Sequence, residues 1–137
     1  MAIGTFSAPK AWEDWATLAI GVWLWASAWP LQLIDGVDDV FGDGSVTLVP
    51  TPGHTPGHQS LLVHLKNGGF IILSGDVVHL EESFDQNIVP SLNTNKQESL
   101  ASMERIRQMI AMYKATLFIN HDKKQEDKLR LLPAFYD

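Results

Sequence analysis

The segment Thr51-Pro-Gly-His-Thr-Pro-Gly-His58 carries the most information about the fold of this chain. Two prolines and two glycines in so short a run exclude a regular helix or strand and predict a stiff loop. Residues 45–50, directly before it, alternate as a strand does and follow the turn residues Gly42-Asp43-Gly44. Because metal sites tolerate little displacement of their ligands, a stiff loop at a strand end is a suitable place for a ligand such as His54.

Outward from this loop, the sequence predicts further strands and one long helix. Residues 59–65 and 69–74 are strand-like runs around Lys66-Asn67-Gly68, which is typical of a hairpin turn. Residues 116–119 predict another short strand, and residues 95–113 predict a helix, with Thr94 and Gln97 spaced as a capping box. The side chains expected in the core from this helix are Leu100, Met103, Ile106, Met109, Ile110, Met112 and Tyr113.

Three candidate metal ligands each follow the carboxyl end of a predicted strand: His54, Asp76 and His121. Strand ends that share one edge of a sheet bring distant sequence positions together, so we expect these three side chains to converge. Imidazole together with carboxylate suits zinc or another first-row divalent metal. Taken singly, Asp76 is better explained as a helix cap or turn residue and His121 as a half-buried surface histidine, and only the coincidence of three favours a metal site.

The composition limits the kinds of site. At 137 residues the chain is one small domain or part of one. Its formal net charge of -6 disfavours a nucleic-acid surface, since such surfaces concentrate Lys and Arg. The absence of cysteine excludes disulfides, thiolate nucleophiles and cysteine-based zinc sites. Any metal is therefore held by histidine and carboxylate.

The first thirty residues differ in composition from the rest. All five tryptophans lie between Trp12 and Trp29, and residues 15–34 contain no charged side chain. About 20 apolar residues suffice for a helix to cross a membrane. A membrane-inserted helix and an apolar helix docked on the protein both remain open, whereas Glu13 and Asp14 disfavour a cleaved signal peptide. We therefore predict a Trp-rich apolar helical segment over residues 1–30 and an α/β domain over residues 31–137.

The motifs from Thr51 to Ser60, Leu73-Ser-Gly-Asp76 and Asn120-His-Asp122 resemble the metallo-β-lactamase superfamily, especially its N-acyl homoserine lactonase branch. The resemblance covers residues 31–137 and implies an α/β (α+β) fold, the C-terminal half of an αββα sandwich with a zinc site at its edge. It implies a bacterial quorum-quenching hydrolase that opens a small-molecule lactone or ester with zinc-activated water. The implied location is the cytoplasm or the inner membrane.

The same resemblance implies residue roles. In that family, the residues that match His54 and His121 each bind one metal, and the residue that matches Asp76 bridges both. His58 and Asp122 would lie behind these ligands and orient them. Lactonases place at this position a tyrosine that contacts the substrate carbonyl. His79 of this chain would donate a similar hydrogen bond to that carbonyl or act as a further metal ligand. We therefore predict that Asp76 and His79 are catalytic.

The sequence departs from that family in its first half. No histidine precedes His54, so the His-x-His-x-Asp-His motif that supplies the other ligands is absent. We expect one or two zinc ions, the second needing ligands that this chain lacks, and a sheet face that the Trp-rich segment or a second chain would cover. The alternative is a non-catalytic or mononuclear metal-binding remnant, membrane-tethered or oligomerising. Residues 12–29 resemble the tryptophan-punctuated helix of SPW-repeat membrane proteins, which implies membrane contact through residues 12–34.

Overall fold

A computed structural model describes residues 34–130 and 134–137 of the chain, which divides into two units between Leu33 and Ile34. The predicted Trp-rich segment, residues 1–30, lies outside the described residues, and so does almost all of the stretch predicted to contact a membrane. Within the part that the structure describes, no helix is long and apolar enough to span a membrane. Membrane contact, self-association and cellular location stay predictions from the sequence.

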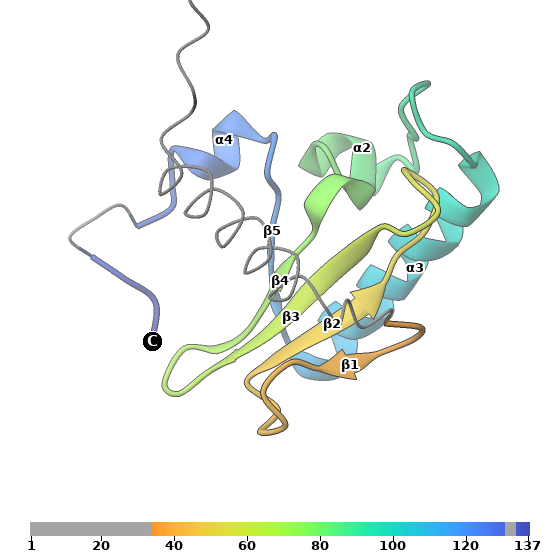
Figure 1. The fold of residues 1–137 in the computed structure, drawn as a ribbon. Coiled ribbons are helices and arrows are strands. Elements are labelled where there is room, and N and C mark those ends of the chain that lie inside the picture. Colours follow the sequence, from red (N-terminus) through yellow and green to blue (C-terminus); the bar gives the residue numbers. More distant parts are fainter. Residues whose placement is uncertain (1–33, 131–133) are drawn as a thin grey trace, which may run out of the picture. The chain divides into compact units, whose positions relative to one another are not determined.

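The second unit is built on a five-stranded mixed sheet in the order β1-β2-β3-β4-β5 (Figure 1). The strands are β1 (Asp38–Asp39), β2 (Val46–Pro50), β3 (Gln59–Leu65), β4 (Gly69–Leu73) and β5 (Thr116–Phe118). Strands β1 to β4 are antiparallel neighbours, whereas β5 runs parallel to β4. Strands β2, β4 and β5 therefore point the same way, and their carboxyl ends share the upper edge of the sheet in Figure 1.

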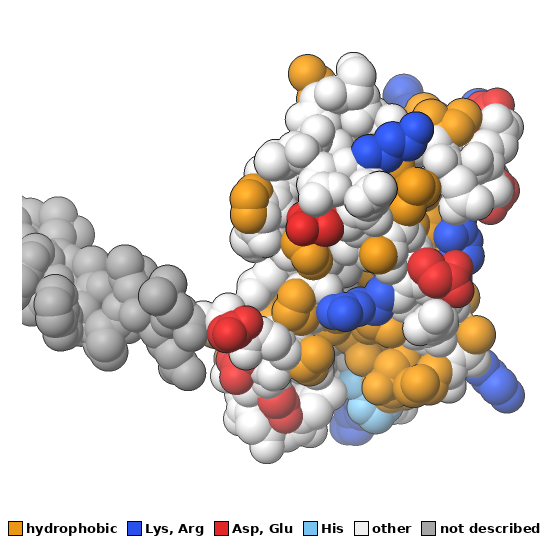
Figure 2. All heavy atoms as spheres, turned by 90° about the vertical axis from the view of Figure 1, so that its right-hand side faces the viewer, with side chains coloured by type: hydrophobic (Ala, Val, Ile, Leu, Met, Phe, Trp, Pro, Cys, Tyr) orange, Lys and Arg blue, Asp and Glu red, His pale blue; other side chains and the backbone are white. Residues whose placement is uncertain are grey.

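Short helical elements follow the strands at this edge, and one long helix covers the sheet. They are η1 (Gly75–Val77), α2 (Glu81–Asp85), α3 (Lys96–Tyr113) and α4 (Lys123–Glu126). Met103 and Ile106 of α3 are almost fully buried and belong to one core cluster with Ile72 of β4. On the side of the molecule where α3 lies, charged and hydrophobic side chains are interspersed (Figure 2), as expected for a helix with one buried face.

The two faces of the sheet follow from the strand alternation. Val49, Leu62 and Ile72 lie on the face that packs against α3. The alternate residues, among them Leu61 and Leu73, lie on the other face and are partly buried. The sequence therefore places apolar side chains on both faces, which is typical of a sheet covered on both sides.

The predicted strands are confirmed to within one residue at each end, and the α/β class is confirmed. The predicted helix cap was wrong by one position. Asn95 is the N-cap, and its side chain accepts hydrogen bonds from the backbone N–H groups of Gln97 and Glu98. The Thr94 hydroxyl instead donates to the backbone carbonyl of His54, so it is not available to the helix.

The predicted core face of the helix was too wide. Met103 and Ile106 are buried, and Leu100, Met109 and Ile110 pack partly against the core. Met112 is 73% exposed and Tyr113 is 37% exposed, so neither is a core side chain. Both lie in the last turn of α3, where the helix ends at Lys114 in a left-handed conformation.

Candidate metal centre

Four side chains from three segments gather at the carboxyl edge of the sheet. His54 lies in the loop between β2 and β3, Asp76 lies in η1 after β4, and His79 follows η1. His121 follows β5. One possible ligand atom from each of Asp76, His79 and His121 lies within 4.8 Å of the others. The structure therefore brings together the three predicted ligands and His79.

Asp76 stands between two of the histidines. Its Oδ1 lies 2.9 Å from Nε2 of His121, and its Oδ2 lies 3.5 Å from Nε2 of His54. The hydrogen bond from His121 lowers the pKa of the Asp76 carboxyl, and this outweighs the opposing effect of burial. The carboxylate is therefore ionised at neutral pH and turns one oxygen toward each imidazole.

His79 packs against the other imidazoles, but one of its ring nitrogens has no hydrogen-bond partner among the described residues. Its ring is nearly parallel to that of His121, with centroids 5.3 Å apart, and it lies 5.7 Å from the ring of His54. Its Nδ1 is buried and finds no hydrogen-bond partner in the described part of the chain. Burial lowers the pKa of His79, and the nearby Asp76 carboxylate opposes this only in part, so the neutral ring is favoured.

His58 lies directly behind Asp76, and both of its ring nitrogens have hydrogen-bond partners. Its Nε2 accepts a hydrogen bond of 2.9 Å from the backbone N–H of Asp76, which places the ring proton on Nδ1. Nδ1 then donates to the carbonyl of Thr51 at 3.0 Å and lies 2.8 Å from the Thr51 hydroxyl. Gly75 is needed beside this ring, since a Cβ there would lie 2.7 Å from Nε2 of His58. His58 therefore positions Asp76 through its backbone.

The loop that carries His54 is docked on the amino end of α3. The carbonyls of Gly53 and His54 accept hydrogen bonds from the backbone N–H groups of Asn95 and Thr94. Gly53 has φ +131° and lies so close to Ser99 that an added Cβ would be 2.3 Å from the Ser99 nitrogen. Such an approach is open only to glycine. The sequence predicted a stiff loop, but the helix as its support was not foreseen.

The side chain of His54 is also oriented from α3. Its Nδ1 lies 3.1 Å from Oδ1 of Asn93, and the amide nitrogen of Asn93 donates to the Ser99 hydroxyl. An acceptor on Nδ1 leaves Nε2 free to face Asp76, as is usual for histidines that bind metals. Sequence reasoning missed Asn93, because an asparagine far from the histidine motif carries no local signal.

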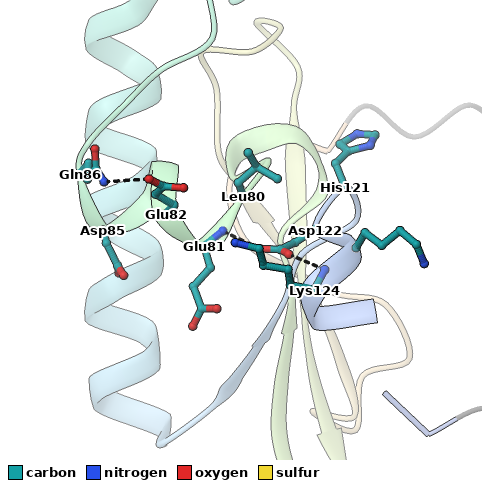
Figure 3. A pocket seen from close by; sticks show the side chains of 9 residues that line it. Leu80, Glu81, Glu82, Asp85, Gln86, His121, Asp122 and Lys124 are labelled. Carbon is teal, nitrogen blue, oxygen red and sulfur yellow. Dashed lines mark hydrogen bonds between the residues drawn. The ribbon is translucent and has the colours of Figure 1, made fainter. Parts of the chain in front are cut away.

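Asp122 was predicted to orient a ligand, and the structure places it at the joint between two helices. Its side chain accepts hydrogen bonds from the backbone N–H groups of Glu81, Lys124 and Gln125, which join the start of α2 to the start of α4 (Figure 3). These bonds lower the pKa of the Asp122 carboxyl. Asp122 therefore fixes the segment that follows His121.

A hollow of about 550 Å³ opens beside His121, between α2 and α4. Its walls carry both acidic and basic side chains, and its lining includes Leu80, Glu81, Gln86, Asp122 and Lys124 (Figure 3). His121 projects at its upper rim in the same view. The hollow therefore gives a small molecule access to the side of the cluster on which His121 lies.

The donor set fits a divalent cation. Three imidazoles and one ionised carboxylate are donors of the kind that zinc binds in hydrolytic sites, and all four come from fixed segments. The unmatched Nδ1 of His79 also marks a place where a polar partner is missing from the described residues. The geometry therefore supports the fit of zinc or a similar first-row ion.

No family model matches the chain. Among curated proteins, it is 32% identical over 102 residues to the N-acyl homoserine lactonase AttM of Rhizobium radiobacter, a match that covers 74% of this chain and 39% of that protein. It is 36% identical over 90 residues to an N-acyl homoserine lactonase of a Bacillus species, covering 66% of this chain and 36% of that protein.

Among solved structures, it matches an N-acyl homoserine lactone hydrolase with the product N-hexanoyl-L-homoserine bound at the catalytic metal centre. That match has a TM-score of 0.69 and 31% identity, and it covers 77% of this chain and 41% of the other. A structure of the AiiA lactonase of B. thuringiensis with N-decanoyl-L-homoserine at its active site gives the same scores and coverage.

About three quarters of this chain is therefore homologous to N-acyl homoserine lactonases, and its fold is that of the metallo-β-lactamase-like lactonase structures. The predicted fold and the predicted resemblance to lactonases are confirmed. The comparisons give no support to the resemblance of residues 12–29 to SPW-repeat proteins. The chain spans about two fifths of the length of the curated relatives that it matches.

Proposed function

We propose that this chain forms the metal-binding part of a hydrolase that opens a lactone of the N-acyl homoserine lactone type. One observation carries the proposal: His54, Asp76 and His121 converge at the edge of a sheet that is homologous to lactonases. A homologous structure holds a homoserine product at its catalytic metal centre. The proposed substrate is therefore a lactone or related ester, and the proposed cofactor is zinc.

A divalent cation at such a site lowers the pKa of a bound water toward neutrality and polarises a carbonyl oxygen. The chain's own residues hold and orient the donors. Asp76 supplies the negative charge, while His58 fixes the backbone of Asp76 from behind. His54 and His121 supply imidazole nitrogens from opposite sides of the carboxylate. His79 is the remaining imidazole, available either to the substrate carbonyl or to the cation.

The second candidate function is metal binding without turnover. It is favoured by the observation that all donors of the described cluster gather around the single carboxylate of Asp76. No histidine precedes His54 in the sequence, so a dinuclear centre would need donors from elsewhere. One ion held by this cluster is therefore the minimum that the proposed function requires.

The test is lactone opening by the full 137-residue chain after zinc loading. We expect hydrolysis of N-hexanoyl-L-homoserine lactone, followed through the proton that ring opening releases, and its loss on chelation. Asp76→Asn should lower kcat/KM by about a hundredfold, because loss of even a supporting group costs metal sites about 10- to 100-fold. His64→Phe is the matched control, since His64 is exposed on β3 and stacks on Phe70.

A folded, zinc-loaded protein that opens the lactone no faster than free zinc would exclude the hydrolase. If that inactive protein holds one zinc ion per chain, the second candidate function, metal binding without turnover, would be supported. Activity that survives Asp76→Asn in full would show that the reaction takes place elsewhere on the chain.

A further inference from the structure

His54 and His79 do not stand in the same relation to Asp76. The ligand atoms that lie within 4.8 Å of one another come from Asp76, His79 and His121, a group that does not include His54. We propose that Asp76, His79 and His121 together bind one first-row divalent cation, zinc above all, and that His79 is a metal ligand. The inference rests on the proposed function in one respect, since it places the cation beside the same carboxylate.

The backbone on both sides of this pair is fixed by the core. Val77 and Val78 lie between Asp76 and His79 and are 3% and 1% exposed. The chain turns through η1 at Asp76 and becomes extended at Val78, which returns His79 to the same edge of the sheet. Ligands three residues apart with two buried valines between them form a stiff pair, as metal binding requires.

The second observation is the Nδ1 atom of His79, which is buried without a hydrogen-bond partner among the described residues. Native structures rarely leave a buried polar atom unmatched, and the exceptions call for a functional explanation. A neutral imidazole has one donor and one acceptor nitrogen. A cation at Nδ1, with the proton on Nε2, would give this atom the partner that the described residues do not supply.

Binding needs a small local adjustment. Tetrahedral zinc ligands lie about 3.3 Å apart. Oδ1 of Asp76 and Nε2 of His121 are 2.9 Å apart and have to open slightly, whereas donors up to 4.8 Å apart have to close by on the order of 1 Å. The rings of His79 and His121 are nearly parallel, and one of them has to turn, because a nitrogen binds metal in its ring plane. The side chain of His121 is 56% exposed and is therefore the one that is free to turn.

His54 serves the other side of the carboxylate. It faces Oδ2 of Asp76 at 3.5 Å, whereas His121 faces Oδ1 at 2.9 Å. Its other nitrogen is engaged by Asn93. The proposed cation lies between His79 and His121 and takes Oδ1, the oxygen of Asp76 nearest His121, so His54 remains beside Oδ2. Loss of His79 and loss of His54 should therefore have different effects.

The test is metal binding by the full chain, stripped with a chelator and titrated with Zn²⁺ by calorimetry and with Co²⁺ by optical absorption. We expect one ion per chain. His79→Phe should weaken binding about a hundredfold or more, and His79→Asp, which restores a ligand, should recover most of the affinity. His64→Phe should leave the affinity within about twofold, and His54→Phe should cost much less than His79→Phe.

Affinity unchanged in His79→Phe, or no ion bound by the wild-type chain, would overturn the inference. Equal losses of metal affinity in His54→Phe and His79→Phe would also count against the inference, because His54 would then contribute to the same cation as His79. If His79→Phe does not fold, the imidazole nitrogen shifts of the wild-type chain decide. Zn²⁺ must then move a His79 nitrogen resonance by the large shift that direct ligation produces.

These outcomes are separable from those of the lactonase test. Binding that depends on His79 without lactone opening supports the cation site and excludes the hydrolase. Lactone opening, together with a zinc affinity that His79→Phe leaves unchanged, supports the hydrolase and excludes His79 as a metal ligand.

Discussion

The loop between β2 and β3 and the turn after β4 meet at the same edge of the sheet, yet they differ in how fully their polar groups are matched. In the loop, both ring nitrogens of His58 are hydrogen-bonded, and the carbonyls of Gly53 and His54 accept from the start of α3. In the turn, Nδ1 of His79 is buried without a partner in the described part of the chain.

The hydrogen-bonded loop residues stabilise this edge of the sheet, whereas His79 carries a buried nitrogen that no described residue contacts by a hydrogen bond. Each hydrogen bond of the loop contributes to stability, and each buried group left unmatched costs about 1–3 kcal/mol. A group kept at such a cost is more readily explained by what it binds than by folding. Changes in the loop should therefore affect stability, whereas a change at His79 should affect binding.

The largest expected effect comes from Gly53→Ala. The new Cβ would lie 2.3 Å from the backbone nitrogen of Ser99, at a residue with φ +131°. Overpacking against backbone and the strained φ together should destabilise the chain by about 3 kcal/mol or more. Urea unfolding followed by circular dichroism measures this loss.

Gly57→Ala is the matched control within the same loop. An added Cβ at Gly57 meets no atom within 4 Å, so the free energy of unfolding should change by less than about 0.5 kcal/mol. Equal losses in the two variants would mean that the loop is not held by its contact with Ser99.

The second comparison sets His58→Phe against His79→Phe in metal-free protein. Phenylalanine at position 58 leaves the backbone N–H of Asp76 and the Thr51 carbonyl without their partner, which should cost roughly 1–3 kcal/mol. At position 79 it removes an atom that was already unmatched and its desolvation cost, so stability should not fall and should rise by up to about 1–3 kcal/mol. Thermal unfolding of both variants after chelation gives the two values.

A loss at His79 as large as that at His58 would contradict the distinction between the two segments. It would mean that His79 is held by contacts that matter for folding, such as its stacking on His121. A loss at neither position would show that the hydrogen bonds of His58 are replaced by water.

The sequence was most informative where local chemistry determines structure. Alternation and turn residues located the strands, and the parallel direction of β2, β4 and β5 explains why ligands placed after three strand ends converge. The short elements β1, η1, α2 and α4 were not predicted, because they lack the run of apolar residues that located the equally short strands β2, β4 and β5.

The remaining misses concern interactions between distant residues. Thr94 was assigned to the helix cap, but its hydroxyl is taken by His54, forty positions earlier. Asn93 orients His54 over a similar separation. Such pairings depend on how the loop docks on α3, and propensities of single residues do not contain that information.

The smallest expected effect is a change of stability with pH. Burial lowers the pKa of His58, although the Thr51 carbonyl and Asp76 oppose it in part. The unfolded chain, with a histidine pKa of about 6.5, therefore binds the proton more readily than the folded chain. Stability of the metal-free protein should be full above about pH 7 and should fall as the pH drops through 6.5. The urea midpoint at pH 7.5 and pH 5.5 measures the loss.

The pKa of His79 is also lowered by burial, so both rings contribute to the pH dependence. Protonation of His58, however, also removes the acceptor for the Asp76 N–H. The dependence on pH should therefore weaken more in His58→Phe than in His79→Phe, and a reversed order would show that the neutral state of His58 is not what the loop requires.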